Sequence, residues 1–318
     1  MTIRSHWKKT RNALIVGTVI LGGNLAPSNL LAAESSKTAA IDLEIKKTWS
    51  IPLREISALS LFDKNLYLAS DNERDFLRLP IDGGDFKTME VSQSKSLSLK
   101  APKGMKLSKK SQWEGLAIDK AGTMFAVKES KDQIFQFTND GLATRLYQLQ
   151  YFDGRKNKRK GYEGLLLMKN SHVLIALTAP PTLIEYGPKG EKALGVNHET
   201  LLLKDSAFTP PSSDDLYPLA SWTLESPKGC ETSDLTLSSL GSVLVLLKDC
   251  FHIVRAPNLD PSKKSFTPEQ VWNYPSEIDH AEGLVEMNDA FLISVDQMSD
   301  SRNLFWVEAK TKEPKKAP

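Results

Sequence analysis

The chain has 318 residues, of which 40% are hydrophobic and 25% are charged, and its formal net charge is +2. This length suits one large globular domain. The first 33 residues carry four of the 41 basic residues and none of the 39 acidic ones, so the remainder has a charge of 37 − 39 = −2. A nearly neutral remainder leaves no global nucleic-acid footprint, and we expect no nucleic-acid partner.

Residues 1–33 have the features of an export signal. Four basic residues precede an apolar stretch from Ala13 to about Leu21, and the small residues Ala32 and Ala33 offer a cleavage site. Two glycines interrupt the apolar stretch, which makes it short for a membrane span. We therefore expect a periplasmic or secreted protein with no stable membrane span after cleavage. An uncleaved N-terminal anchor is the alternative.

One short phrase recurs at intervals of roughly 50 residues, and each copy opens an apolar strand, crosses a turn and meets a second apolar strand. The five copies begin at Glu55, Trp113, Tyr162, Glu231 and Ala281. A repeat of this length with a few strands per period is typical of a β-propeller. The sequence therefore predicts an all-β fold, a five-bladed β-propeller over residues 41–309.

The strands of each blade follow in chain order. The first blade is expected to begin at Glu55 and to include Asn65–Ser70 and Asp75–Leu79. The second is expected at Glu114–Ile118, Thr123–Val127, Gln133–Thr138 and Leu142–Leu149. The third is expected to begin at Glu163 and to include His172–Leu177 and Thr182–Tyr186. The last two are expected at Glu231, Phe251–Arg255 and Gln270–Asn273; and at Glu282–Met287, Ala290–Val295 and Asn303–Glu308. The fourth strand of the third blade lies either near Leu201 or near Leu216–Leu219.

The fifth blade lacks a fourth strand of its own, whereas the alternating segment Ile41–Ile51 has no partner. Pairing the two would close the ring with an N-terminal strand and hide two exposed edges. Six blades are possible if the stretch Lys192–Pro227 contains another. The tail, residues 310–318, is polar and rich in lysine, and we expect it to be disordered.

Cys230 and Cys250 are the two cysteines of the chain. The segment between them has the pattern of a hairpin with its turn at Ser238–Gly241, which places the cysteines opposite each other. In an oxidising compartment they would form a disulfide, worth roughly 3 kcal/mol for a loop of this size. Two free buried thiols are the alternative.

The five phrases also align one polar position of each blade, which a propeller brings to its central channel. These positions are Ser57, Glu114, Glu163, Ser233 and Glu282. Three carboxylates on one axis repel each other unless a cation neutralises them. Calcium accepts oxygen ligands in flexible geometry, whereas magnesium demands an octahedron and zinc favours His or Cys. We therefore expect an axial calcium ion. The alternative is that Glu-Gly-Leu is a structural corner.

A second polar set lies where the second strand of each blade returns to the same face: Asp71, Glu129, Thr178, Asp249 and Asp296. Its members could bind a second metal, orient a water molecule or act as a general base. Asp71, Glu129 and Asp296 are the catalytic candidates, with solvated turns as the alternative. The basic runs Lys100–Lys110 and Arg155–Lys160 could attract an anionic small-molecule or surface ligand; ordinary solvated loops are the alternative.

Several of these segments together resemble the phytase-like propeller family, labelled for esterase-like activity of phytase, and the related SdiA-regulated propellers. They are Trp113-Glu-Gly-Leu-Ala-Ile-Asp with Lys128-Glu129, Lys160-Gly-Tyr-Glu-Gly-Leu-Leu, Tyr217-Pro-Leu-Ala-Ser-Trp leading to Glu231-Thr-Ser-Asp-Leu, and Ala281-Glu-Gly-Leu with Val295-Asp296. The resemblance covers most of residues 50–308 and implies a propeller with hydrolase activity.

The axial set is also similar to that of the soluble calcium-activated nucleotidases, or apyrases, whose ligands follow the order Ser, Glu, Glu, Ser, Glu. This resemblance implies a five-bladed ring with an axial calcium. The chain departs from that family at Thr178–Thr182, where the family carries arginines for phosphates. The prediction is thus an exported, monomeric, calcium-dependent hydrolase of a phosphoester or another ester. The alternative is a non-catalytic, calcium-stabilised binding module.

Overall fold

The computed structural model describes residues 39–311 except 82–84, 109, 111, 152–160, 204–205, 226–228 and 298–301. The predicted export signal, the basic run Arg155–Lys160 and most of the predicted tail therefore lie outside the described residues. Strands dominate what is described, as predicted for an all-β fold. No helix in this part of the chain is long and apolar enough to cross a membrane.

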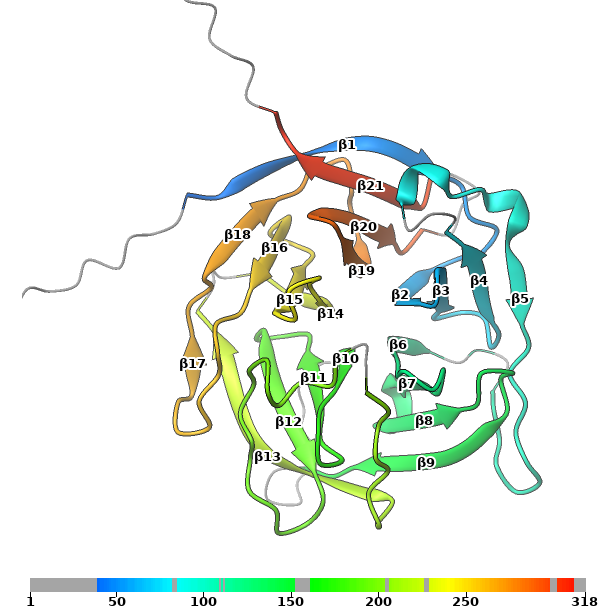
Figure 1. Ribbon diagram of the computed structural model, residues 1–318, viewed down its shortest axis with the longest axis vertical. Coiled ribbons are helices and arrows are strands. Elements are labelled where there is room, and N and C mark those ends of the chain that lie inside the picture. The colour runs from blue at the N-terminus through cyan, green and yellow to red at the C-terminus, as the bar shows by residue number, and fades with distance from the viewer. Residues whose placement is uncertain are drawn as a thin grey trace, which may run out of the picture. The chain divides into compact units, whose positions relative to one another are not determined.

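The strands form antiparallel groups of four that surround a common centre, in the manner of a propeller (Figure 1). The inner strands are β2 (Ile56–Phe62), β6 (Trp113–Ile118), β10 (Tyr162–Leu167), β14 (Thr232–Leu237) and β19 (Ala281–Met287). The second strands are β3 (Asn65–Ser70), β7 (Met124–Lys128), β11 (Val173–Leu177), β15 (Val243–Leu247) and β20 (Ala290–Val295).

The third and outer strands complete each group. The third strands are β4 (Phe76–Pro80), β8 (Gln133–Phe137), β12 (Thr182–Gly187), β16 (His252–Arg255) and β21 (Leu304–Ala309). The outer strands are β5 (Lys95–Leu97), β9 (Ala143–Leu149), β13 (Asp215–Leu224), β18 (Gln270–Asn273) and β1 (Ile41–Trp49). Short parallel contacts link outer strands of different groups, β9 with β13 and β1 with β18.

The N-terminal strand completes the last group. β1 pairs antiparallel with β21, from Leu43 opposite Ala309 to Trp49 opposite Leu304. Asn303 strengthens the junction, because its side-chain amide donates to the carbonyls of Ile51 and Leu53 and its Oδ1 accepts from the Ile51 amide. The predicted pairing of the N-terminal segment with the last strands is confirmed.

One outer strand was not predicted, and another decides between two predicted positions. The first group has a fourth strand, β5, which is only three residues long and contains one apolar residue, the half-buried Leu97. The fourth strand of the third group is β13, which includes the second of the two predicted positions, and Leu201 makes an isolated bridge with Met168 instead. The described part of 192–227 contributes β13 and no further four-stranded group.

Apolar side chains fill the space between neighbouring groups, because strands buried on both faces need cover on both sides. In the first two groups, the fully buried Trp113 packs edge-to-face against Phe76, Phe135 and Phe137, with ring centroids 5.4–6.0 Å apart. Such pairs add about 0.5–1.5 kcal/mol each beyond burial of their area. The Trp113 indole donates to the Arg74 carbonyl, so its one polar atom is satisfied.

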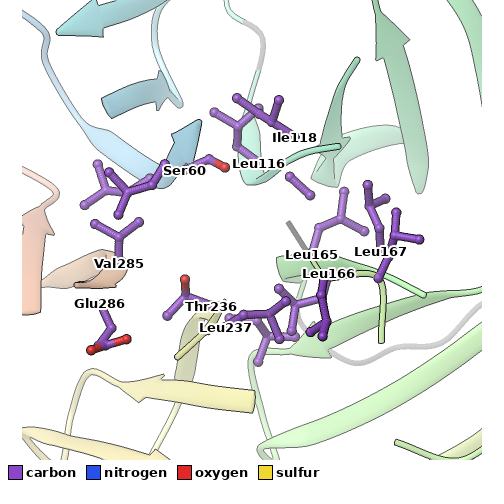
Figure 2. Close-up of a pocket in the computed structure, with 16 residues that line it drawn as sticks. Ser60, Leu116, Ile118, Leu165, Leu166, Leu167, Thr236, Leu237, Val285 and Glu286 are labelled. Atoms are coloured by element: carbon purple, nitrogen blue, oxygen red, sulfur yellow. The ribbon is translucent and has the colours of Figure 1, made fainter. Parts of the chain in front are cut away.

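All inner strands run in the same direction along the centre, and the two ends of the channel differ in chemistry. Their C-terminal halves surround a hollow of about 80 Å³ whose lining is mostly leucine, with Leu116, Leu165 and Leu237 among its walls (Figure 2). Leu202 and Leu203 from the connection after β12 also line it. The N-terminal halves carry the polar positions predicted from the repeat. The predicted site residues therefore lie toward the end of the channel opposite this leucine-lined hollow.

Candidate functional site

The five predicted axial positions are equivalent in the strand register. In each group the register between the inner and second strands shifts near the start of the inner strand, as at Ile56/Ala58 and Trp113/Gly115. The first residue inside each irregularity is Ser57, Glu114, Glu163, Ser233 or Glu282, and in the third group Gly164 lies inside it as well. A bulge leaves its extra residue out of the ladder and redirects that side chain. We call these first residues the bulge set.

The glycines that follow the glutamates have a structural role. A Cβ on Gly115 would lie 2.4 Å from the Glu163 carbonyl oxygen, and one on Gly164 would lie 2.1 Å from the Leu235 amide nitrogen. Each glycine thus lets its inner strand approach the next one around the channel. The structural alternative for Glu-Gly-Leu therefore applies to the glycine, and these contacts assign no role to the glutamate.

A second equivalent position follows the last residue of each second strand. In every group its backbone N–H donates to the carbonyl of the residue before the inner strand, over 2.9–3.2 Å, as from Asp71 to Glu55. We call these residues the rim set: Asp71, Glu129, Thr178, Lys248 and Asp296. Four of them were predicted, but Asp249 was wrong, because the register places Lys248 at this position.

All members of the bulge and rim sets except Ser233 and Thr178 line one cavity of about 180 Å³, here called the acidic cup. Its lining contains seven carboxylates, one lysine and one serine: Glu55, Asp71, Glu114, Glu129, Glu163, Glu282, Asp296, Lys248 and Ser57. All three predicted catalytic residues and four of the five predicted metal ligands therefore lie together. Ser233 occupies its bulge position but does not line the cavity.

Burial and mutual repulsion raise the pKa values of the cup glutamates. Burial first, and then the charges of Glu163 and Asp71, raise the pKa of Glu114 to about 11. Burial and the charge of Glu282 raise the pKa of Glu163 to about 8. Burial raises the pKa of Glu282 to about 7, although Lys248 opposes the shift. The raised pKa values mean that too little positive charge lies near these carboxylates to stabilise all of them in the ionised form.

Two neighbours partly satisfy the glutamates. The Thr178 hydroxyl donates to Glu163 Oε1, and Lys248 Nζ lies 2.8 Å from Glu282 Oε1.

Among the residues that the structure describes, no group of three or more His, Cys, Asp or Glu side chains forms a ready-made metal site. The carboxylates surround the cavity without converging on one point.

Two buried oxygens of the bulge and rim sets have no hydrogen-bond partner among the described residues. They are Asp71 Oδ1 and Ser233 Oγ. Ser57 Oγ, by contrast, donates to the Trp113 carbonyl of the next inner strand. A buried oxygen without a donor costs free energy, so Asp71 Oδ1 is available to a cation. The donor set consists of carboxylates and hydroxyls, which suits calcium better than zinc.

The two other catalytic candidates also have raised pKa values. For Glu129 the causes are burial and then the charge of Asp71. For Asp296 they are likewise burial and the charge of Asp71. A carboxylate whose pKa rises toward neutrality is a better proton acceptor. Glu129 is half-buried and Asp296 is exposed at the rim of the cup, where solvent and a ligand can reach them.

The rim position of Lys248 could have been found from spacing. Asp71 follows Ser57 by 71 − 57 = 14 residues and Thr178 follows Glu163 by 178 − 163 = 15. Asp249 follows Ser233 by 249 − 233 = 16, whereas Lys248 follows it by 248 − 233 = 15. Asp249 was predicted because it is acidic, although the spacing of 15 residues favours Lys248.

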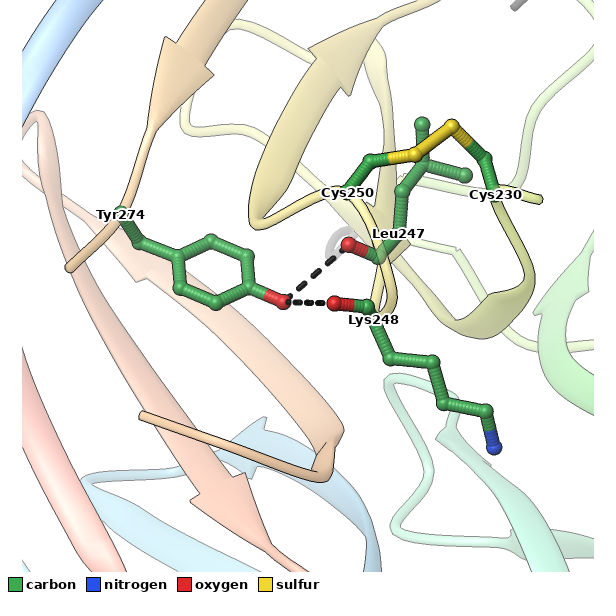
Figure 3. Close-up of a disulfide and its surroundings, with 5 residues drawn as sticks. All are labelled: Cys230, Leu247, Lys248, Cys250 and Tyr274. Carbon is green, nitrogen blue, oxygen red and sulfur yellow. Dashed lines mark hydrogen bonds between the residues drawn. A yellow bond between two sulfur atoms is a disulfide. The ribbon is translucent and has the colours of Figure 1, made fainter. Parts of the chain in front are cut away.

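A disulfide between Cys230 and Cys250 fixes the backbone next to Lys248, with Cα atoms 5.2 Å apart (Figure 3). The predicted bridge is confirmed. Tyr274 adds a second restraint, because its hydroxyl donates to the carbonyls of Leu247 and Lys248 over 3.1 and 3.2 Å. The loop that presents Lys248 is therefore held from two directions.

The sequence of the chain agrees with this architecture. A model of the phytase-like family, described as esterase-like activity of phytase, matches residues 51–256. The chain belongs to the phytase-like family. The match includes Ser57, Glu114, Glu163 and Ser233 of the bulge set and ends before Glu282. No curated protein matches this phytase-like protein in sequence.

Several solved structures are similar to this chain at low sequence identity and modest TM-scores. Glutaminyl cyclase from Myxococcus xanthus is 9% identical, with 86% of this chain and 100% of that chain covered and a TM-score of 0.49. A streptogramin B lyase is 15% identical, covering 85% and 73%, with a TM-score of 0.42. The aldose sugar dehydrogenase of Streptomyces coelicolor is 12% identical, covering 84% and 98%, with a TM-score of 0.43. These values transfer no activity to the phytase-like chain.

Proposed function

We propose that this protein is an exported, five-bladed propeller that binds calcium in the acidic cup and hydrolyses a phosphoester or another ester there. The N-terminal strand closes the ring, and the disulfide supports export to an oxidising compartment. One observation carries the proposal: equivalent bulges in successive groups bring a set of buried carboxylates to one cavity.

The formal charge of the cup explains the need for a cation. With its seven carboxylates ionised and Lys248 protonated, the described lining carries −7 + 1 = −6. Burying such a charge without compensation is costly. Calcium accepts roughly 6–8 oxygen ligands, and Glu114, Glu163 and Glu282 would hold it with Ser57 and water molecules.

Hydrolysis needs a polarised ester and a base that takes a proton from water. Bound calcium would supply Lewis-acid polarisation. Glu129 and Asp296 stand at the rim with raised pKa values and can each accept that proton. Asp71 is close enough to both residues that its charge raises their pKa values. The water oxygen would form a bond to the phosphorus or carbonyl carbon of the ester, and the bond from that atom to the alcohol oxygen would break. The departing alcohol oxygen would take up the proton that the base had removed from water.

A second candidate is a non-catalytic binding module in which calcium only stabilises the ring. Lys248 favours it, because it is the one basic residue in the described lining of the cup. Thr178 belongs to the segment Thr178–Thr182, where this chain lacks the arginines that the apyrases carry for phosphates. A site for phosphate groups normally has more cationic donors.

A substrate screen separates the two candidates. Chelator-treated protein is assayed with phosphomonoester, nucleotide and carboxylester substrates, with and without calcium. We expect calcium-dependent turnover of at least one class, and a loss of about 100-fold or more in kcat for Glu129→Gln or Asp296→Asn. Calcium binding with no turnover on any class would support the binding module instead.

A further inference from the structure

Lys248 is the exception in the chemistry of the acidic cup. It occupies a rim position at which three other groups carry a carboxylate, Asp71, Glu129 or Asp296. Its ammonium lies 2.8 Å from Glu282 Oε1, and the two side chains are only 19% and 12% exposed. The ammonium of Lys248 is thus held against a carboxylate inside the cup.

The backbone of Lys248 is fixed on several sides. Its N–H donates to the Glu231 carbonyl over 2.9 Å, and its carbonyl accepts from the Phe251 amide and the Tyr274 hydroxyl over 3.2 Å each. The disulfide closes the same hairpin (Figure 3). The main chain therefore cannot withdraw the lysine. The flexible side chain, with its four-carbon stem, is the part that can move.

The partner of Lys248 is a residue of the bulge set. Glu282 is one of the three glutamates that would hold the calcium ion, so the ammonium and a divalent cation need the same carboxylate. An ion pair that is mostly withdrawn from solvent is weakened little by salt. Binding a divalent cation through Glu282 must therefore overcome this pair or share the carboxylate with it.

We propose that Lys248 is a tethered counter-ion of the acidic cup, which holds Glu282 in the metal-free protein and limits the affinity of the cup for a divalent cation. This inference rests on the proposed calcium site and adds a determinant of its affinity. It also explains how the cup remains folded without metal: one of its glutamates always has a cation.

The test compares Lys248→Met with Lys248→Arg by calorimetric titration of chelator-treated protein with calcium chloride. Removing the competing charge should lower the calcium Kd about tenfold, since a factor of ten corresponds to 1.4 kcal/mol and hydrogen bonds to charged groups contribute at least that much. The metal-free Lys248→Met protein should melt at a lower temperature than the wild type. Lys248→Arg should keep the wild-type Kd, as should the control Lys64→Met on the exposed β2–β3 turn.

The outcomes distinguish the two proposals. If the wild type binds calcium and Lys248→Met binds it equally or more weakly, the counter-ion role is overturned and the calcium site stands. If neither protein binds calcium, both proposals are overturned. Should Lys248→Met not fold, the side-chain NMR signal of Lys248, assigned by its loss in Lys248→Arg, replaces the titration. It should shift when calcium binds, and an unchanged signal would contradict the role.

Discussion

Asp234 holds the inner strands together at a position where three other inner strands have glycine. Its carboxylate accepts the amides of Leu235 and Leu284 over 2.7 and 2.8 Å, and that of Leu59 as well. These residues belong to β14, β19 and β2. Burial raises the pKa of Asp234 well above its usual value, although the three amides oppose the shift. The sequence analysis did not single out Asp234, because the equivalent positions of the other repeats hold Gly or Ala.

Replacing Asp234 with alanine should leave backbone amides of three groups unpaired in the interior. Each buried donor without a partner costs about 1–3 kcal/mol, so we expect a loss of about 3 kcal/mol or more in the free energy of unfolding. Urea denaturation measures it. The control Asp63→Asn, on the β2–β3 turn where φ is 43°, should change stability little because Asn tolerates that conformation. Equal stabilities for Asp234→Ala and wild type would argue against this role.

At the scale of the strand, the repeated bulge decides which side chains reach the cup. The repeat in the sequence was sufficient to predict the inner strands, most second and third strands, the closing strand and the bulge set. It could not predict β5, which has only three residues and one apolar side chain, or the place of Ser233 outside the cavity lining. Such details depend on side-chain packing between neighbouring groups, which no single repeat encodes.

The close approach of the inner strands gives a test of this geometry. Gly164→Ala would place a Cβ 2.1 Å from the Leu235 nitrogen, and only a backbone shift relieves that contact. We expect a loss of about 3 kcal/mol or more in stability, beyond the usual range for overpacking. Gly190→Ala is the matched control: nothing lies within 4 Å of its Cβ, so it isolates the cost of a positive φ, about 1–2 kcal/mol. Thermal denaturation of both variants should rank them in this order; the reverse ranking would refute the packing argument.

At the scale of the whole molecule, the carboxylates of the cup act against the stability of the ring when no cation is bound. Its glutamates come from separate groups, so their repulsion acts across the ring and opposes its closure. The packed interfaces between groups and the β1–β21 pairing resist that repulsion. A divalent cation at the cup would turn the same charges into cross-links between groups.

The pH dependence of stability without metal follows from the raised pKa values. Glu282 and Glu163 have folded pKa values of about 7 and 8, above their usual 4.5. Their stabilising contribution is complete below pH 4.5 and is lost as the pH rises through 7 and 8, because the folded state then gives up protons that it binds more tightly than the unfolded state. In chelator, we expect the Tm to fall between pH 5 and 8. Saturating calcium should remove most of this fall, and a Tm that rises over the same range in chelator would contradict the shifts.

Calcium titration of the chelator-treated wild type, followed by its Tm, tests the central claim most directly. A ligand at 100 times its Kd stabilises the fold by about 2.7 kcal/mol, so the Tm should rise by several degrees. Glu163→Gln, which retains the shape of the side chain but not its charge, should lose most of this rise. A wild-type Tm that does not respond to calcium at millimolar concentration would show that the acidic cup is not a calcium site.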